Sequence, residues 1–228
     1  MSAPRSVPDG DAYRPPPDVG LEVLHVEPAL VVLVKPPGLL SEPGRGPGKR
    51  DSLLVRTQAV YPDARIVHRL DMMTSGVIVL ARAAGAHAAL SQAFRERAVD
   101  KRYEALVHGR PASDEGDIAL PLAVDWPNRP RQVVCHETGK PSLTHYRVVG
   151  TTQVDGVGAL TRVALAPVTG RTHQLRVHLA ALGCPIAGDP FYGVEGDTAP
   201  RMMLHAHRLT FAHPLTGEPL AFESAVPF

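Results

Sequence analysis

The feature that most constrains the fold is a succession of short apolar runs, each bounded by turn residues. Runs of this length, rich in Val, Leu and Ile, are typical of β-strands rather than of helices. The candidate strands cover residues 21–26, 30–35, 77–81, 102–107, 117–122, 143–149, 160–165, 209–211 and 220–222. Because several neighbours are joined by short turns, we predict an α+β fold in which a mixed, largely antiparallel sheet is flanked by a few helices.

Three segments predict these helices. Residues 52–60 follow Asp51, a candidate N-terminal cap. Residues 84–97 carry apolar side chains at the spacing of one helical face. Residues 172–182 carry a stripe of leucines and are followed by Gly183, a residue type that commonly ends helices.

Composition indicates one folded domain and a flexible end. Residues 1–20 contain five prolines and little apolar content, so we expect a flexible Pro-rich tail, followed by a single domain over residues 21–228. Hydrophobic residues make up 44% of the chain, which suffices for a sizeable core. Two cysteines, no signal-peptide pattern and no apolar run of membrane-spanning length favour a cytoplasmic protein. The formal net charge of +1 neither supports nor excludes nucleic-acid binding, because a local basic groove matters more than the total.

The most informative motif is His68-Arg69-Leu70-Asp71, followed by Thr74-Ser75-Gly76. It places Asp71 in a turn-like stretch between two apolar runs. An acid on a loop between buried strands indicates a catalytic acid, base or nucleophile, and the plainer interpretation is a turn or helix cap. A protein-kinase catalytic loop is rejected, because in kinases Asp directly follows Arg, whereas Leu70 intervenes here.

Further motifs follow in order along the chain. They are Lys35-Pro36-Pro37-Gly38, Lys101-Arg102-Tyr103-Glu104, Thr169-Gly170-Arg171-Thr172-His173-Gln174-Leu175-Arg176, Gly188-Asp189-Pro190-Phe191-Tyr192-Gly193 and Leu204-His205-Ala206. Together with the Asp71 motif they resemble the large ribosomal pseudouridine synthase family over residues 21–228. Residues 125–141 also resemble short members of that family, which lack a separate N-terminal RNA-binding module, so we expect none here.

The resemblance implies an isomerase that converts specific uridines in RNA to pseudouridine without a cofactor. Uracil would be detached from ribose at N1, turned in place and rejoined through C5. Asp71 would either attack C1′ as a nucleophile or remove the C2′ proton as a base, and the sequence leaves both open. The expected substrates are uridines in 23S rRNA, in a tRNA anticodon stem-loop or in both, and the expected state is a monomer.

Two alternatives belong to other classes. One is a non-catalytic RNA-binding protein on the same fold, which would need no buried acid. The other is a nucleoside hydrolase or glycosylase, but the chain shows no Asp-rich cluster of the kind that some of those enzymes use.

The same resemblance assigns roles to further residues. Arg176 would pair with Asp71 and keep it charged. Tyr103 would stack on uracil or take part in proton transfer, which makes Asp71, Tyr103 and Arg176 the expected catalytic set. Arg69 would enter the RNA stack that the flipped uridine leaves.

The remaining expected RNA-binding residues surround this set; they are His68, Arg171, His173, Arg129 and Arg131. The two histidines would hydrogen-bond within the site, and the arginines would contact phosphates, as would a second basic cluster of Arg95, Arg97, Lys101 and Arg102. Trp126 either stacks on a base or packs in the core. The histidine spacings match no zinc signature, so we expect no metal site.

Overall fold

The computed structural model describes residues 13–46 and 48–228. Its elements in chain order are β1 (Glu22–Val26), β2 (Leu30–Lys35), α1 (Leu53–Val60), β3 (Arg65–Ile66), β4 (Ser75–Ala81), α2 (Ala84–Glu96), β5 (Asp100–Val107), β6 (Glu115–Ile118), β7 (Leu122–Val124), a 3₁₀ turn η1 (Trp126–Asn128), β8 (Gln132–Val134), β9 (Thr144–Val154), β10 (Gly158–Pro167), α3 (Gln174–Ala181), β11 (Leu204–Ala212) and β12 (Pro219–Glu223). No helix in these described ranges is long and apolar enough to cross a membrane.

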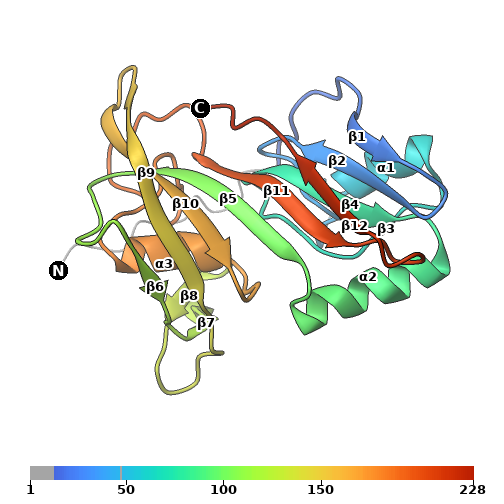
Figure 1. Ribbon diagram of the computed structural model, residues 1–228. Helices are drawn as coiled ribbons and strands as arrows, with labels where there is room; N and C mark the ends of the chain where they lie inside the picture. Colours follow the sequence, from blue (N-terminus) through green and yellow to red (C-terminus); the bar gives the residue numbers. More distant parts are fainter. Residues whose placement is uncertain (1–12, 47) are drawn as a thin grey trace.

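One ten-stranded sheet in the described part of the chain crosses the whole molecule (Figure 1). Its main path runs β1-β2-β4-β11-β5-β10-β9-β6, with β3 beside β4 and β12 beside β11. β4 and β11 run parallel, whereas the other pairs in this sheet are antiparallel. β7 and β8 form a separate hairpin. The predicted mixed, largely antiparallel sheet flanked by helices is confirmed.

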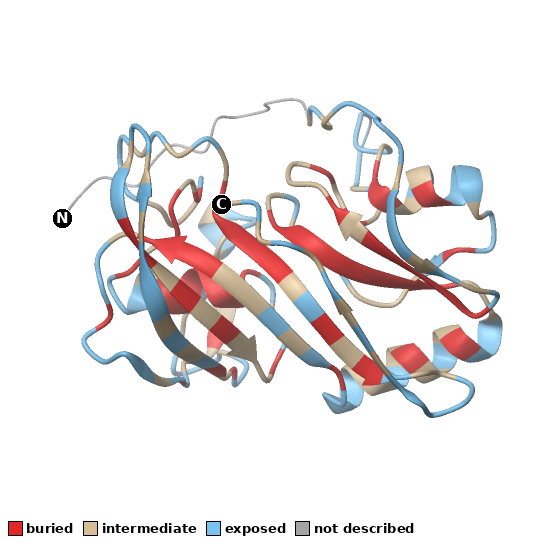
Figure 2. Cartoon of the chain, turned by 45° about the horizontal axis from the view of Figure 1, so that its top comes forward, coloured by how far each residue is buried: buried red, intermediate tan, exposed pale blue. Residues whose placement is uncertain are grey.

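β4 is buried along its whole length and is one of several strands drawn mostly in red in Figure 2. Both of its faces are covered. On one face Val79 belongs to a cluster with Leu90 of α2, and on the other Ile78 belongs to a cluster with Leu53 of α1. A strand covered on both faces has a continuous apolar sequence, which explains why residues 77–81 show no alternation.

The parallel pairing of β4 with β11 positions the Asp71 motif. Gly76 pairs with Ala206 and has φ 121°. A Cβ at this position would lie 2.2 Å from the Ala206 carbonyl oxygen, so only glycine fits. Next to it, Ser75 Oγ lies 2.7 Å from His205 Nδ1. The end of the motif is therefore joined to β11, which fixes where the preceding loop emerges.

The helix ends differ from expectation at one cap. Ser52 caps α1, because its Oγ accepts the Val55 N–H at 3.3 Å. The prediction of Asp51 as the cap is wrong, since its carboxylate binds Arg56 at 2.7 Å. Gly183, with φ 73°, follows the end of α3 as predicted.

The predicted flexible tail over residues 1–20 lies largely outside the described residues. Its described end contacts the domain. The Tyr13 hydroxyl accepts the Leu40 N–H at 3.0 Å, and Arg56 donates to the Pro16 carbonyl oxygen at 2.6 Å. This end of the tail is thus attached, in contrast to the expectation, and the domain boundary at residue 21 stays a prediction.

Candidate active site

Asp71 lies in a short loop, residues 69–74, here called the Asp71 loop. The residue before it is held from both sides, because Ser41 Oγ donates to the Leu70 carbonyl oxygen at 2.7 Å and accepts the Leu70 N–H at 3.1 Å. The Thr74 N–H donates to the Asp71 carbonyl oxygen at 3.0 Å and closes a turn. The backbone is therefore fixed around Asp71, while its side chain keeps 28% exposure.

The fully buried side chain of Lys35 also stabilises the Asp71 loop. Its Nζ donates to the carbonyl oxygens of Met72 at 3.0 Å, Leu39 at 2.7 Å and Pro36 at 2.9 Å. Three acceptors require three hydrogens, which only the ammonium form carries. Burial lowers the pKa of Lys35 to about 7, although the charge of Asp71 acts in the opposite direction.

The guanidinium of Arg176 contacts two acids, Asp189 closely and Asp71 weakly. Its Nη1 lies 3.4 Å from Asp71 Oδ2, at the long end of a hydrogen bond. Its Nε and Nη2 bind Asp189 at 2.7 and 2.8 Å, a bidentate contact between two buried side chains. The structure thus brings Arg176 to Asp71 as expected, but its main partner is Asp189.

Asp189 lies in residues 188–193, here called the Asp189 loop. Its Oδ1 also accepts the N–H groups of Phe191 at 2.8 Å and Tyr192 at 3.1 Å. The rings of these two residues lie 5.3 and 5.1 Å from the Arg176 guanidinium. The loop therefore holds Arg176 on several sides and compensates most of its charge, which leaves a weaker contact for Asp71.

Tyr103 lies on β5 beside this pair and is partly buried. Burial raises the pKa of Tyr103, and the negative charge of Asp71 raises it further. The hydroxyl therefore keeps its proton at neutral pH. It has no hydrogen-bond partner among the described residues, so it is available to an incoming group.

The two predicted site histidines are neutral. Burial lowers the pKa of His68 to about 3; its Nε2 accepts the Val79 N–H at 3.1 Å, and its ring stacks on Phe94. Burial lowers the pKa of His173 to about 4, and its Nδ1 lies 2.8 Å from the Tyr192 hydroxyl. Both therefore bind the protein's own groups. Within residues 13–46 and 48–228, no group of three or more His, Cys, Asp or Glu side chains is placed to hold a metal ion.

The predicted RNA-binding arginines separate into two kinds. The Arg69 side chain is 63% exposed and pairs with Glu42 at 2.6 Å, an exposed contact that is easily exchanged. Arg129 is exposed and Arg171 partly exposed. Arg131 donates to a carbonyl oxygen of the Asp189 loop. Arg131 is therefore part of the scaffold, and the other three remain accessible.

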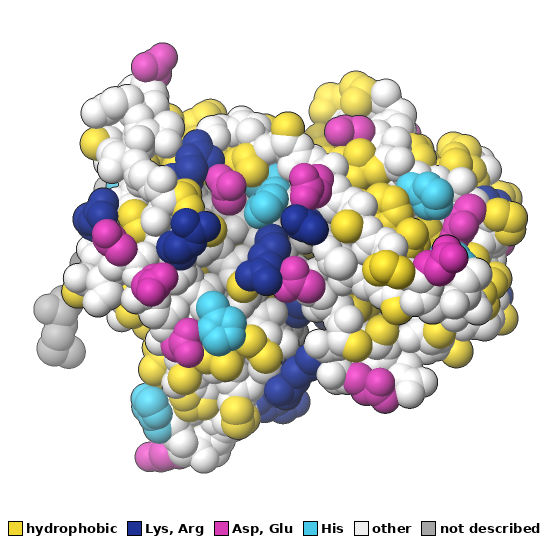
Figure 3. Space-filling model, viewed as in Figure 1, with side chains coloured by type: hydrophobic (Ala, Val, Ile, Leu, Met, Phe, Trp, Pro, Cys, Tyr) yellow, Lys and Arg dark blue, Asp and Glu magenta, His cyan; other side chains and the backbone are white. Residues whose placement is uncertain are grey.

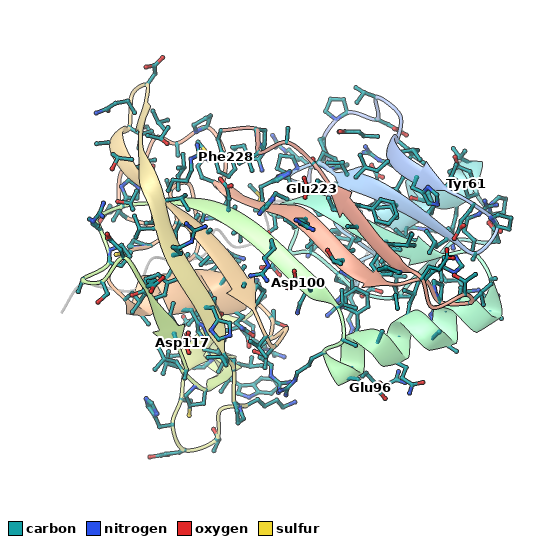
Figure 4. All side chains as sticks on the ribbon, in the orientation of Figure 1. Tyr61, Glu96, Asp100, Asp117, Glu223 and Phe228 are labelled. Atoms are coloured by element: carbon teal, nitrogen blue, oxygen red, sulfur yellow. The ribbon has the colours of Figure 1, made fainter. Side chains whose placement is uncertain are left out.

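The face shown in Figure 3 carries Lys and Arg side chains along its middle, interspersed with Asp and Glu. Figure 4 labels two of these acids, Asp100 and Glu223, on this face. Asp100 pairs with Arg102 at 3.0 Å and Glu223 with Arg208 at 3.1 Å, and on the neighbouring strands Glu104 pairs with Arg162 at 2.9 Å. Because these charges compensate each other, the basic cluster expected around Arg102 is partly neutralised on this face.

Sequence reasoning did not assign roles to Lys35 and Asp189. Both stand inside motifs that carried the family resemblance, which was the available signal. Their partners are distant in sequence, however: Met72 for Lys35 and Arg176 for Asp189. Only the folded chain shows that they support the two sides of the site.

Comparison with known proteins identifies the relatives of this chain. A family model described as RNA pseudouridylate synthase matches residues 29–181. The dual-specificity RNA pseudouridine synthase RluA of Escherichia coli O6:H1 is 49% identical over 218 residues, which cover 95% of this chain and 98% of that protein. The RluA of Yersinia pestis is 50% identical over 208 residues, which cover 90% of this chain and 99% of that protein.

Solved structures show the same fold. Human RNA pseudouridylate synthase domain containing 1 superposes with a TM-score of 0.78 at 30% identity, covering 94% of this chain and 87% of that one. Human RNA pseudouridylate synthase domain containing 4 gives 0.71 at 27% identity, covering 90% and 88%. The isomerase class expected from the motifs is thereby confirmed, and the chain belongs to the RNA pseudouridylate synthase family.

Proposed function

We propose that this protein isomerises specific uridines to pseudouridine in 23S rRNA and in a tRNA anticodon stem-loop, with Asp71 as the reacting acid. The observation that carries the proposal is the difference in hydrogen bonding between the two acids that contact Arg176. Asp189 is saturated with protein donors, whereas Asp71 is fixed in its backbone, partly exposed and only weakly bound.

The carboxylate of Asp71 suits either mechanism that the reaction allows. Its Oδ2 faces Arg176, and its Oδ1 has no hydrogen-bond partner in the described part of the chain. That free oxygen would attack C1′ of the flipped uridine or remove the C2′ proton. Because Asp189 takes the Nε and Nη2 groups of Arg176, only Nη1 is left to orient Asp71, and it contacts Oδ2 rather than Oδ1.

Tyr103 would act on the base while Asp71 acts on the sugar. Its ring would stack on uracil and keep water away while the detached base turns. Its hydroxyl would act as a relay after the new bond forms: it would accept the proton that C5 loses while it passes its own proton to the Asp71 carboxylate, which is free again at that stage.

Arg69 would take the place of the flipped uridine in the base stack of the RNA. Extruding a base costs a few kcal/mol, and a flat guanidinium entering the stack offsets part of that cost. The exposed position of Arg69 at the start of the Asp71 loop suits this role, with Glu42 as its partner in the absence of RNA. Arg129 and Arg171 would contact phosphates.

Substrate range is tested with transcripts of 23S rRNA and of tRNA anticodon stem-loops that carry tritium at C5 of uridine. Tritium release is expected from both, because C5 loses its hydrogen when it joins the ribose, and mapping the product locates the modified uridines. Binding without release from either RNA would instead favour the non-catalytic RNA-binding alternative.

The proposal also includes a monomeric protein in the cytoplasm. Both cysteines are free, which suits a reducing compartment. Light scattering of the purified protein during gel filtration checks the monomer, and a mass corresponding to two chains would refute it.

A further inference from the structure

Trp126 projects from the hairpin formed by β7 and β8, which lies outside the main sheet at the lower edge of Figure 1. It is the chain's single tryptophan, and it is 68% exposed. The sequence left open whether this side chain packs in the core, and the structure excludes that. An exposed aromatic side chain of this size offers a large apolar surface to a binding partner.

The turn that presents Trp126 is well defined. Asp125 and Arg131 are joined by a backbone hydrogen bond of 3.0 Å, and Asn128 bonds to both of them through its backbone at 3.1 and 3.0 Å. The Asn128 side chain donates to both carboxylate oxygens of Asp125 at 3.1 and 3.0 Å. The backbone that carries the indole is therefore held in place, so ordering this turn on binding costs little entropy.

Arg129 covers one face of the indole. Its guanidinium carbon lies 4.5 Å from the ring centroid, within the range of a cation–π contact. The high exposure of Trp126 leaves the opposite face open to solvent. The pair therefore offers a flat aromatic surface together with an exposed positive charge.

The same turn is attached to the active site. Arg131 donates to the Phe191 carbonyl oxygen, and the Gln132 N–H donates to the Tyr192 hydroxyl at 2.7 Å. Tyr192 belongs to the Asp189 loop, and its ring lies 5.1 Å from the Arg176 guanidinium. The position of Trp126 is thus connected to Arg176 through a continuous series of contacts.

We propose that Trp126 and Arg129 form a stacking platform for an unpaired RNA base near the target uridine. The inference rests on the proposed function, and it deepens it by naming a residue pair that selects the substrate. Bases displaced from a helix are commonly bound by stacking on aromatic rings, and arginine adds attraction to the neighbouring phosphate. An apolar protein partner would fit less well, because the indole is flanked by an exposed cation.

The single tryptophan makes a direct optical test possible. The Asp71→Asn variant is titrated with a fluorescein-labelled anticodon stem-loop transcript, and binding is followed independently by fluorescein anisotropy. We expect tryptophan emission to fall as the RNA saturates the protein and its quenching by acrylamide to decrease, because a stacked base covers the open face. Unchanged emission and unchanged acrylamide quenching at full RNA occupancy would overturn the proposal, while leaving the pseudouridine synthase activity of the wild-type protein intact.

Substitutions provide the second test. Trp126→Ala should raise KM for the stem-loop by about tenfold or more, the usual range for removing one stacked base, with a smaller effect on kcat. Trp126→Phe should restore most of the loss. Val133→Ala, which removes another exposed apolar side chain from the same hairpin, is the matched control and should leave KM unchanged.

An abasic position in the RNA identifies the partner base. At the stacked position, Trp126→Ala and wild type should bind the abasic RNA equally, whereas at other positions the variant should remain weaker. If Trp126→Ala matches Val133→Ala on intact RNA, Trp126 has no part in recognition.

Discussion

The Asp71 loop and the Asp189 loop each present one aspartate to the same arginine, and they treat that acid in opposite ways. Asp189 is fully buried, binds Arg176 through two short contacts and accepts two backbone N–H groups. Asp71 keeps 28% exposure and makes one contact of 3.4 Å. The first acid has its hydrogen-bonding capacity filled by the protein, and the second keeps Oδ1 without a hydrogen-bond partner among the described residues.

Under the proposed function, one charged cluster would serve both structure and chemistry. A buried arginine is costly unless it is paired, and Asp189 provides that pairing. Asp71 can then lie near the Arg176 guanidinium without forming a close ion pair with it. The comparison predicts that changes in the Asp189 loop alter stability, whereas changes in or beside the Asp71 loop alter catalysis.

Asp189→Asn should give the largest change in stability among these variants. It should lower the free energy of unfolding by about 3–5 kcal/mol, because it breaks a buried ion pair and leaves Arg176 uncompensated. Urea unfolding measures the change. Asp100→Asn, which removes an exposed partner of Arg102, is the control and should cost less than about 1 kcal/mol. Equal losses in the two variants would show that Asp189 has no special structural role.

Two tyrosines sharpen the comparison. Tyr103→Phe should slow tritium release on the order of 10²-fold at unchanged stability, because stacking survives and proton transfer is lost. Tyr192→Phe should instead lower the free energy of unfolding by about 1–3 kcal/mol, since the Gln132 N–H loses its acceptor. A fully active Tyr103→Phe protein would remove its hydroxyl from the mechanism.

Arg69 and Arg131 extend the comparison with smaller effects: the first variant should change activity and the second stability. Arg69→Ala should reduce activity on a structured stem-loop about tenfold more than on an unpaired oligonucleotide, because only the structured RNA must replace a flipped base. Its thermal unfolding should match wild type. Arg131→Ala should lower the unfolding temperature, because its contact with the Asp189 loop is lost. Equal activity losses of Arg69→Ala on both RNAs would reject insertion into the stack.

Lys35 gives an effect of another kind, a dependence of stability on pH. Burial lowers its pKa to about 7 in the folded protein from 10.5 in an open chain. Between these values the unfolded chain binds more protons, so Lys35 makes stability rise with pH, by at most about 1.4 kcal/mol per pH unit. Urea unfolding between pH 7 and pH 9 should show this rise. Lys35→Met should flatten it, and an unchanged slope in that variant would contradict the assignment.

Much of the fold follows from local sequence patterns. The run of residues 30–35 coincides with β2, and the helix predicted over 84–97 differs from α2 by one residue. β7 and β8 were missed because strands of three residues are too short to show a period. Ser52 replaced Asp51 as a cap because Arg56 binds the Asp51 carboxylate, a contact that propensity does not contain.

The sequence indicates candidate residues for the site but not the contacts between them. The motifs predict Asp71, Tyr103 and Arg176 as the catalytic set, and in the structure Arg176 Nη1 lies 3.4 Å from Asp71 Oδ2. The dominance of Asp189 over Asp71 as partner of Arg176 depends on how the Asp189 loop folds back on α3. Arg129 and Arg131 are two residues apart and have similar sequence surroundings, yet one is exposed and the other binds a carbonyl oxygen. Only tertiary structure distinguishes them.

The most direct test is single-turnover tritium release by Asp71→Asn on a stem-loop substrate of the wild-type protein, at RNA concentrations that saturate binding. The predicted result is a wild-type unfolding curve, near-normal RNA affinity and a rate reduced by at least about 10³-fold, because the reacting oxygen has lost its charge. Release at a rate close to that of wild type would contradict the assignment of Asp71 as the reacting acid.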